Sequence, residues 1–159
     1  MTMTLEGLYE DFRDLLVLLA DADVEFVIVG AYALAFHGAP RASGDIDLFI
    51  RPSFANAGRV FDALARFGAP LESAGVTPAD FARPGTVYQI GLPPRRIDLL
   101  TEISGVTFDE AWASRVMAEM DGRAVGFIGR AALLKNKEAA GRPKDIADAA
   151  RLRRTKRAP

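Results

Sequence analysis

The chain of 159 residues contains no cysteine and a single histidine. The lack of cysteine excludes disulfides, thiolate zinc sites, iron–sulfur clusters and cysteine nucleophiles. Long apolar runs are also missing, since the stretch from Val24 to His37 is too short and too interrupted to span a bilayer. Residues 1–11 contain acidic residues and no basic segment followed by an apolar core, so no signal peptide is expected. We therefore expect a cytoplasmic protein without membrane contact.

Length and composition favour one globular domain over residues 1–159. Apolar residues make up 50% of the chain and charged residues 26%, which is enough for one core and too little for two full domains. The charge is uneven, because residues 142–159 carry a net charge of +5 and the preceding part carries −6. The basic tail at 151–159 suits contact with phosphates or an acidic partner, although such a terminus is more often simply a solvated helix end.

The hydrophobic pattern predicts helices and strands that alternate irregularly. Helices are expected at 5–20, 32–36, 54–67, 107–112, 131–140 and 145–153, and strands at 24–29, 45–50, 87–90, 97–101, 116–120 and 123–128. Residues 69–85 are expected to form a loop with one helical turn near Pro78. The dipeptide Asp121-Gly122 predicts a tight hairpin. Together these elements indicate an α/β fold, a mixed β-sheet with helices packed mainly on one side.

Two acidic residues lie close together on a predicted strand. Asp45 and Asp47 are two positions apart, so both side chains point to the same face of the sheet. Carboxylates this close repel each other, and a hard divalent cation such as Mg²⁺ relieves the repulsion while keeping coordination sites for a phosphate-bearing substrate. The pair alone also fits two exposed acids at a strand edge.

A small-residue pair precedes these acids. Gly30-Ala31 ends the predicted strand at 24–29 and precedes the short helix at 32–36. Backbone N–H groups at such a junction can bind a phosphate, and glycine allows the phosphate to approach the main chain closely. The combination of this pair with Asp-x-Asp is far more specific than either part.

The combined segment 29–48, VGAYALAFHGAPRASGDIDL, resembles the signature of the DNA polymerase beta-like nucleotidyltransferase superfamily. That signature consists of a strand, two small residues, a short helix, a bridging Arg-x-Ser or Arg-x-Thr, and Asp-x-Asp on the next strand. Ala31 stands where many members have Ser or Gly, which removes a hydroxyl contact and leaves the backbone contact. Asp98, in RIDLL, matches the third carboxylate of the family. Residues 137–148, KEAAGRPKDIAD, look like the ending of AbiEii-like nucleotidyltransferases, which are often toxins of toxin–antitoxin pairs.

The resemblance covers residues 23–152 and implies a minimal nucleotidyltransferase fold that transfers NMP from an NTP to an acceptor hydroxyl. Asp45 and Asp47 would bind two Mg²⁺ or Mn²⁺ ions, and Asp98 would bind one ion and receive the proton of the attacking hydroxyl. The nucleotide would contact Gly30, Ala31, Arg41, Ser43 and Lys137. The implied acceptor is RNA such as tRNA, or a protein, and the implied partner is a cognate antitoxin.

Several of these assignments have alternatives. Lys135 is a second candidate for the phosphate contact, and Lys137 also fits a solvated helix lysine. Arg41 either binds phosphate or ties its loop to Asp47. Asp145 is expected to be structural, by fixing Lys137 or Arg142 or by capping the last helix. At the level of function, the alternatives are an antibiotic-type enzyme acting on a small molecule and a catalytically inactive nucleotide-binding or antitoxin-like module.

Overall fold

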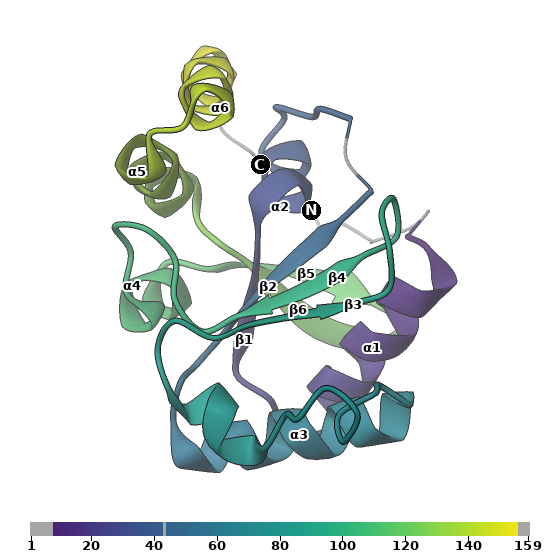
Figure 1. Ribbon diagram of the computed structural model, residues 1–159. Helices are drawn as coiled ribbons and strands as arrows, with labels where there is room; N and C mark the ends of the chain where they lie inside the picture. Colours follow the sequence, from purple (N-terminus) through teal and green to yellow (C-terminus); the bar gives the residue numbers. More distant parts are fainter. Residues whose placement is uncertain (1–7, 43, 156–159) are drawn as a thin grey trace.

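The computed structural model describes residues 8–42 and 44–155, which form a mixed α/β fold around one sheet (Figure 1). Its helices are α1 (Glu10–Asp21), α2 (Gly30–Phe36), α3 (Phe54–Phe67), α4 (Phe108–Ala113), α5 (Arg130–Ala140), α6 (Pro143–Arg154) and the 3₁₀ helix η1 (Pro78–Ala82). Its strands are β1 (Phe26–Val29), β2 (Ile46–Ile50), β3 (Val87–Ile90), β4 (Ile97–Leu100), β5 (Val116–Met120) and β6 (Arg123–Phe127).

The described strands form one six-stranded sheet in the order β3-β4-β2-β1-β6-β5. β2 pairs with β4 in parallel, and β1 pairs with β6 in parallel, whereas the other neighbours are antiparallel. The register places Asp47 opposite Asp98 on one side and opposite Val29 on the other. The acids of two strands that are far apart in sequence therefore meet at the point where β1 ends and α2 begins.

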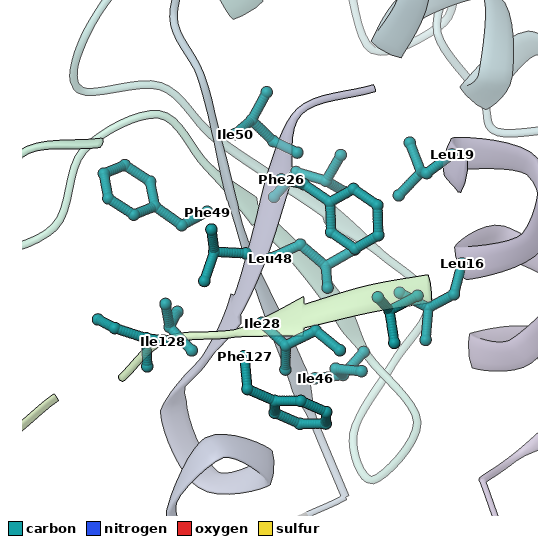
Figure 2. Packing of buried hydrophobic residues seen from close by; sticks show 14 of the residues in the cluster. Leu16, Leu19, Phe26, Ile28, Ile46, Leu48, Phe49, Ile50, Phe127 and Ile128 are labelled. Carbon is teal, nitrogen blue, oxygen red and sulfur yellow. The ribbon is translucent and has the colours of Figure 1, made fainter. Parts of the chain in front are cut away.

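The core lies between the sheet and the helices α1 and α3. The buried positions of α1 are Phe12, Leu15, Leu16 and Leu19, which recur at helical spacing. Figure 2 shows Leu16 and Leu19 facing a layer of strand residues that includes Phe26, Ile28 and Leu48. In Figure 1, α1 and α3 lie together below the sheet, whereas α2, α5 and α6 lie above it, beyond the end of β1.

Local sequence signals set several of the element ends. Ser53 accepts a hydrogen bond from the backbone N–H of Asn56 at the start of α3, and Gly68 ends that helix with a φ of 89°. Thr107 forms a capping box with Glu110 at the start of α4. The predicted hairpin between β5 and β6 is confirmed, with its turn at 121–122. These features depend on neighbouring residues only, which is why the sequence predicts them.

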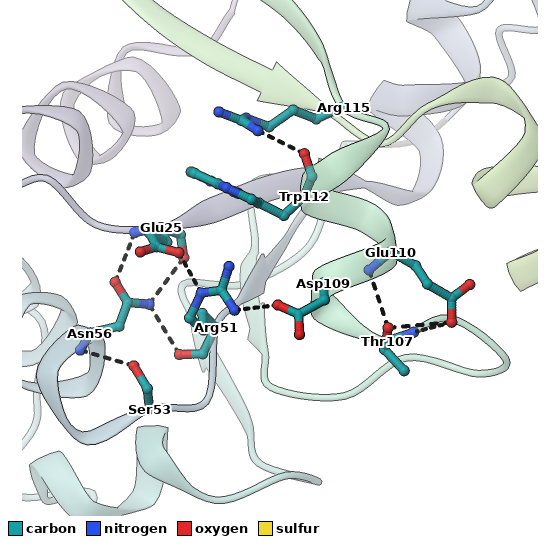
Figure 3. Close-up of polar contacts among 9 residues, drawn as sticks. All are labelled: Glu25, Arg51, Ser53, Asn56, Thr107, Asp109, Glu110, Trp112 and Arg115. Carbon is teal, nitrogen blue, oxygen red and sulfur yellow. Dashed lines mark hydrogen bonds and ion pairs between the residues drawn. The ribbon is translucent and has the colours of Figure 1, made fainter.

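A polar cluster connects β1, β2, α3 and α4 at the end of the sheet opposite the acids. Figure 3 shows Asn56 bridging the two strand ends, because its side chain donates to the carbonyls of Glu25 and Arg51 and accepts from the N–H of Glu25. Arg51 also forms ion pairs with Glu25 and Asp109. Its guanidinium lies 4.5 Å from the ring centroid of Phe108. This cluster fixes α3 and α4 to the central strands.

The expected mixed sheet with helices is confirmed, and a few element bounds differ from the prediction. The first helix was expected from residue 5, but residues 5–7 lie outside the described part, in which α1 begins at Glu10. The last helix begins at Pro143 rather than Asp145, because the fixed φ of proline suits the first turn of a helix. Across the described residues, none of the helices has the length and hydropathy needed to cross a membrane.

Candidate active site

Three carboxylates lie close together. Asp47 is on β2, Asp98 is on β4, and Asp45 directly precedes β2. Asp47 and Asp98 are directly opposite each other in the parallel pair β2–β4, so their side chains share one face of the sheet. The side chain of Asp98 is only 10% exposed, whereas that of Asp45 is 25% exposed. The three predicted acids are thus brought together in the fold, with Asp45 more exposed than Asp98.

The carboxyl group of Asp47 is the most perturbed acid of the cluster. Burial and then the neighbouring charge of Asp98 raise the pKa of Asp47 to about 6, and the positive charge of Lys137 only partly opposes this rise. Asp47 is therefore costly to ionise in the folded protein unless a further cation is present. A group with this property is typical of functional sites.

The raised pKa of Asp47 has a consequence for stability. Because the folded-state pKa lies above the unfolded value of about 3.9, the protonated carboxyl stabilises the fold below about pH 4, and this contribution is lost as the pH rises through 6. We expect the free energy of unfolding of the metal-free parent to fall by about 2 to 3 kcal/mol relative to that of Asp47→Asn between pH 4 and pH 7.5, at ~1.4 kcal/mol per pKa unit.

Urea unfolding of both proteins in EDTA at several pH values measures this difference, and the titrations of acids remote from Asp47 cancel in the comparison. A constant difference in the free energy of unfolding across that range would contradict the raised pKa of Asp47.

Gly30 leaves room for the carboxylate of Asp47. A Cβ atom added at Gly30 would lie 2.1 Å from Oδ2 of Asp47, and the φ of Gly30 is +68°, a conformation that L side chains rarely adopt. The sequence suggested that Gly30 allows a phosphate to approach. The structure adds a second reason, because glycine at this position also allows Asp47 to pack against the start of α2.

Helices α5 and α6 place a buried charge network opposite these acids. Lys137 is only 5% exposed, and its Nζ lies 3.4 Å from Oδ1 of Asp145 and 3.2 Å from Oδ2 of Asp148. Asp145 is fully buried and also accepts a hydrogen bond of 2.6 Å from Nε of Arg142. The structural role expected for Asp145 is confirmed, since it fixes Lys137 and accepts from the N–H of Arg142 at the start of α6.

Arg41 is tied to α6. Its Nε donates to Oδ1 of Asp148 over 2.9 Å, so the expected alternative of a tie to Asp47 is wrong. The sequence could not indicate Asp148 as the partner, because the two residues are far apart in the chain and meet only through the packing of α6. Arg41 nevertheless lies on the cavity described below, where a phosphate contact stays a proposal.

The structure distinguishes between the two candidate lysines. Lys135 is exposed and forms an ion pair of 2.8 Å with Glu110 on α4. Lys137 lies on the same cavity as the three acids, and its charge acts on Asp47. The preference for Lys137 over Lys135 thus agrees with the fold, although the interpretation of Lys137 as a solvated lysine is wrong. Ser43 lies outside the described residues.

A cavity of about 700 Å³ joins these groups. One wall carries the acids, and the opposite wall carries cationic and amide side chains of α5 and α6. The polar residues of this second wall are Asn136, Lys137, Arg142, Lys144 and the acidic Asp145. Gly30 and Ala31 line the cavity where α2 begins. A volume of this size suits a small molecule of the dimensions of a nucleotide.

The sequence analysis missed Arg96, which lies among the acids. Its Nε is 2.8 Å from Oδ1 of Asp98, and its Nη2 is 3.1 Å from Oδ2 of the same carboxylate. The same Nη2 is 3.2 Å from Oδ2 of Asp45. The period of two along the strand was the available signal, since Arg96 and Asp98 are two positions apart and share a face.

The donor chemistry of the cluster fits a divalent ion, although its present arrangement does not form a complete site. Among the described residues, no three His, Asp or Glu side chains are arranged to hold a metal ion. The cation that lies between Asp45 and Asp98 is the guanidinium of Arg96. Oxygen ligands of this kind suit Mg²⁺ or Mn²⁺, and a second cation would relieve the repulsion that raises the pKa of Asp47.

Comparison with solved structures identifies the fold. The lincosamide antibiotic adenylyltransferase LnuA with bound lincomycin matches with a TM-score of 0.56 and 11% identity, over 91% of this chain and 96% of its own. A Thermotoga maritima protein assigned as a nucleotidyltransferase matches with a TM-score of 0.56 and 15% identity, over 96% of this chain and 94% of its own. The antibiotic-resistance factor ANT(2'')-Ia matches with a TM-score of 0.55 and 15% identity, over 89% of this chain and 80% of its own.

No protein-family model matches the sequence, and a comparison with curated proteins finds no match either. At identities this low, the structural matches establish the fold alone. The mixed sheet and the helices that surround it therefore have the nucleotidyltransferase fold.

Proposed function

We propose that the protein is a metal-dependent nucleotidyltransferase that transfers NMP from an NTP to an acceptor hydroxyl. One observation carries the proposal: a single cavity has three carboxylates on its strand wall and, on its helix wall, the buried Lys137 beside the exposed Arg142 and Lys144. Phosphoryl-type transfer needs mainly positioning and neutralisation of charge, and these two walls supply both. The nucleotidyltransferase fold adds support, because it brings the acids of β2 and β4 side by side.

The three acids would have different roles. Asp45, Asp47 and Asp98 would hold the Mg²⁺ or Mn²⁺ ions, with Asp47 at the centre of the group. When bound, two such ions neutralise phosphate charge and activate the attacking hydroxyl. A bond forms between the acceptor oxygen and the α-phosphorus, the bond from that phosphorus to the bridging oxygen of the β-phosphate breaks, and pyrophosphate leaves. Asp98 would receive the proton of the hydroxyl.

The helix wall would bind the triphosphate. Lys137 is the strongest candidate, because two carboxylates fix its Nζ beside Asp47. Arg41 would add a second cation at the cavity. The backbone of Gly30 and Ala31 would contact a phosphate where α2 begins, as the resemblance implies, and Ser43 keeps its assignment from the resemblance only.

For the acceptor, the cavity favours a small hydroxylated molecule over RNA or a protein. Its volume of about 700 Å³ is within the range of small-molecule sites. Two of the structural neighbours are antibiotic-related proteins, LnuA and ANT(2'')-Ia. The finer assignments are a toxin of the AbiEii-like group, an RNA or tRNA acceptor and a cognate antitoxin. They rest on the resemblance of residues 137–148 and are competing outcomes of the test.

Incubation with radiolabelled ATP, GTP, CTP or UTP, Mg²⁺ and a panel of acceptors tests the proposal. The panel contains a lincosamide, an aminoglycoside, bulk tRNA and a protein extract. We expect a labelled small-molecule product and release of pyrophosphate. Label on tRNA or on protein would support the toxin interpretation, and the absence of any transfer would support the inactive module.

The two lysines of α5 provide a matched pair of controls. Lys137→Gln should raise the KM for the NTP by about tenfold or more, because it removes a charge fixed beside the proposed phosphate site. Lys135→Gln removes the same charge from the exposed face and should leave the KM close to that of the parent. The opposite order would move the phosphate contact to Lys135.

A further inference from the structure

The side chain of Arg96 occupies the space between two of the proposed metal ligands. Its guanidinium contacts both oxygens of Asp98, at 2.8 and 3.1 Å, and one oxygen of Asp45, at 3.2 Å. The backbone N–H of Arg96 also donates to Oδ1 of Asp45 over 3.3 Å. Arg96 therefore contacts every carboxylate oxygen of these two acids.

The backbone of Arg96 is fixed by its neighbour on β2. The backbone N–H of Ile46 donates to the carbonyl of Arg96 over 3.0 Å, directly beside the first pair of the β2–β4 ladder. The register of two central strands therefore sets where the Arg96 side chain begins, and the contacts with Asp98 and Asp45 hold its guanidinium. The neighbouring Arg95 is exposed and points to Tyr9, with its guanidinium 4.4 Å from the ring centroid.

The charge of Arg96 also opposes a divalent ion. Arginine stays protonated at every physiological pH, so its charge does not switch off. An ion bound by Asp45 and Asp98 would have to share their oxygens with the guanidinium and would be repelled by it at short range. The positive charge of Arg96 also offsets part of the negative charge of Asp45 and Asp98, so this pair attracts a divalent ion less strongly.

We propose that Arg96 acts as a resident cation that keeps the affinity of the nucleotide-free site for divalent ions low, so that the ion binds together with the nucleotide. The triphosphate brings its own oxygens and negative charge, which offset the positive charge of Arg96. Arg96 is then a positioning residue that makes metal binding depend on the nucleotide. This inference rests on the proposed function, because it requires a nucleotide and a metal ion to share the site.

Titration with Mn²⁺, followed by electron paramagnetic resonance of the free ion, tests the proposal without an activity assay. In the absence of nucleotide, Arg96→Gln should bind Mn²⁺ about tenfold or more tightly than the parent, because it removes one positive charge within contact distance of two ligands. Arg95→Gln removes the same charge one position earlier and should stay within about twofold of the parent, since exposed charges are screened. An unchanged or weaker affinity of Arg96→Gln would overturn the proposal.

Two further arms keep the outcomes separate. Arg96→Lys retains the charge and should stay close to the parent, which gives a second reading if the glutamine variant is poorly folded by circular dichroism. The parent is also titrated with a non-hydrolysable NTP analogue present, against a blank that contains the analogue alone, and tight Mn²⁺ binding beyond that blank is expected. If the parent binds Mn²⁺ with the analogue but Arg96→Gln gains nothing without it, this inference fails and the proposed function stands. If no protein binds Mn²⁺ in either condition, both fail.

Discussion

Replacing Asp47 with asparagine is expected to lower the rate of nucleotide transfer by about three orders of magnitude or more. Asp47 is the central acid, because it lies opposite Asp98 in the sheet and packs against Gly30. An amide has almost the same shape but cannot supply the negative charge that the ions require. The initial rate of labelled product formation, at saturating NTP and acceptor, measures the effect.

The fold should tolerate this change, which separates a loss of chemistry from a loss of structure. In metal-free buffer above pH 6, Asp47→Asn removes a charge that burial and Asp98 make costly, so the variant should be at least as stable as the parent. Asp62→Asn is the matched control, since Asp62 is exposed on α3 and should leave the rate unchanged. Activity of Asp47→Asn within tenfold of the parent would exclude the acid cluster as the metal site.

Asp98→Asn should separate the roles of the two opposed acids. We expect this variant to bind the NTP with nearly the parental affinity and to lose most of its turnover, because the proposed role of Asp98 concerns the attacking hydroxyl. Asp47→Asn should weaken binding of the metal–nucleotide complex as well. If Asp98→Asn abolishes NTP binding and Asp47→Asn preserves it, the two roles are reversed.

Replacing Asp145 with alanine is expected to destabilise the protein by about 3 to 5 kcal/mol, the usual cost of removing one partner from a buried ion pair. Asp145 is fully buried, with a relative exposure of 0%, and it binds both Lys137 and Arg142. Although burial opposes its ionisation, the hydrogen bond from Arg142 and the charge of Lys137 hold the pKa of Asp145 below its ordinary value. Its removal leaves Lys137 buried with one carboxylate fewer.

Glu138→Ala is the matched control for Asp145→Ala. Glu138 lies on α5 and forms an ion pair of 2.7 Å with Arg153 on α6, but both side chains are about half exposed, at 52% and 50%. Exposed pairs of this kind contribute about 0 to 1 kcal/mol. Urea unfolding of the two variants measures the contrast, and equal destabilisation would show that the network around Lys137 contributes no more than a surface pair.

The amino-acid sequence by itself determined the elements and the identity of the central acids. The cap at Ser53, the end of α3 at Gly68 and the hairpin turn at 121–122 depend on backbone sterics and on residues a few positions away. The side-chain period of two likewise places Asp45 and Asp47 on one face of the strand, whatever packs against that face. Such signals can be recognised in a sequence because they are local.

The tertiary structure alone decided what those residues contact. The parallel register of β2 and β4 sets Asp98 opposite Asp47, and the packing of α6 sets Asp148 beside Arg41 and Lys137. The raised pKa of Asp47 and the place of Arg96 among the acids follow from that packing. Burial and charge interactions depend on which distant segments of the chain pack together. The tertiary fold determines that packing, and the spacing of residues along the sequence does not.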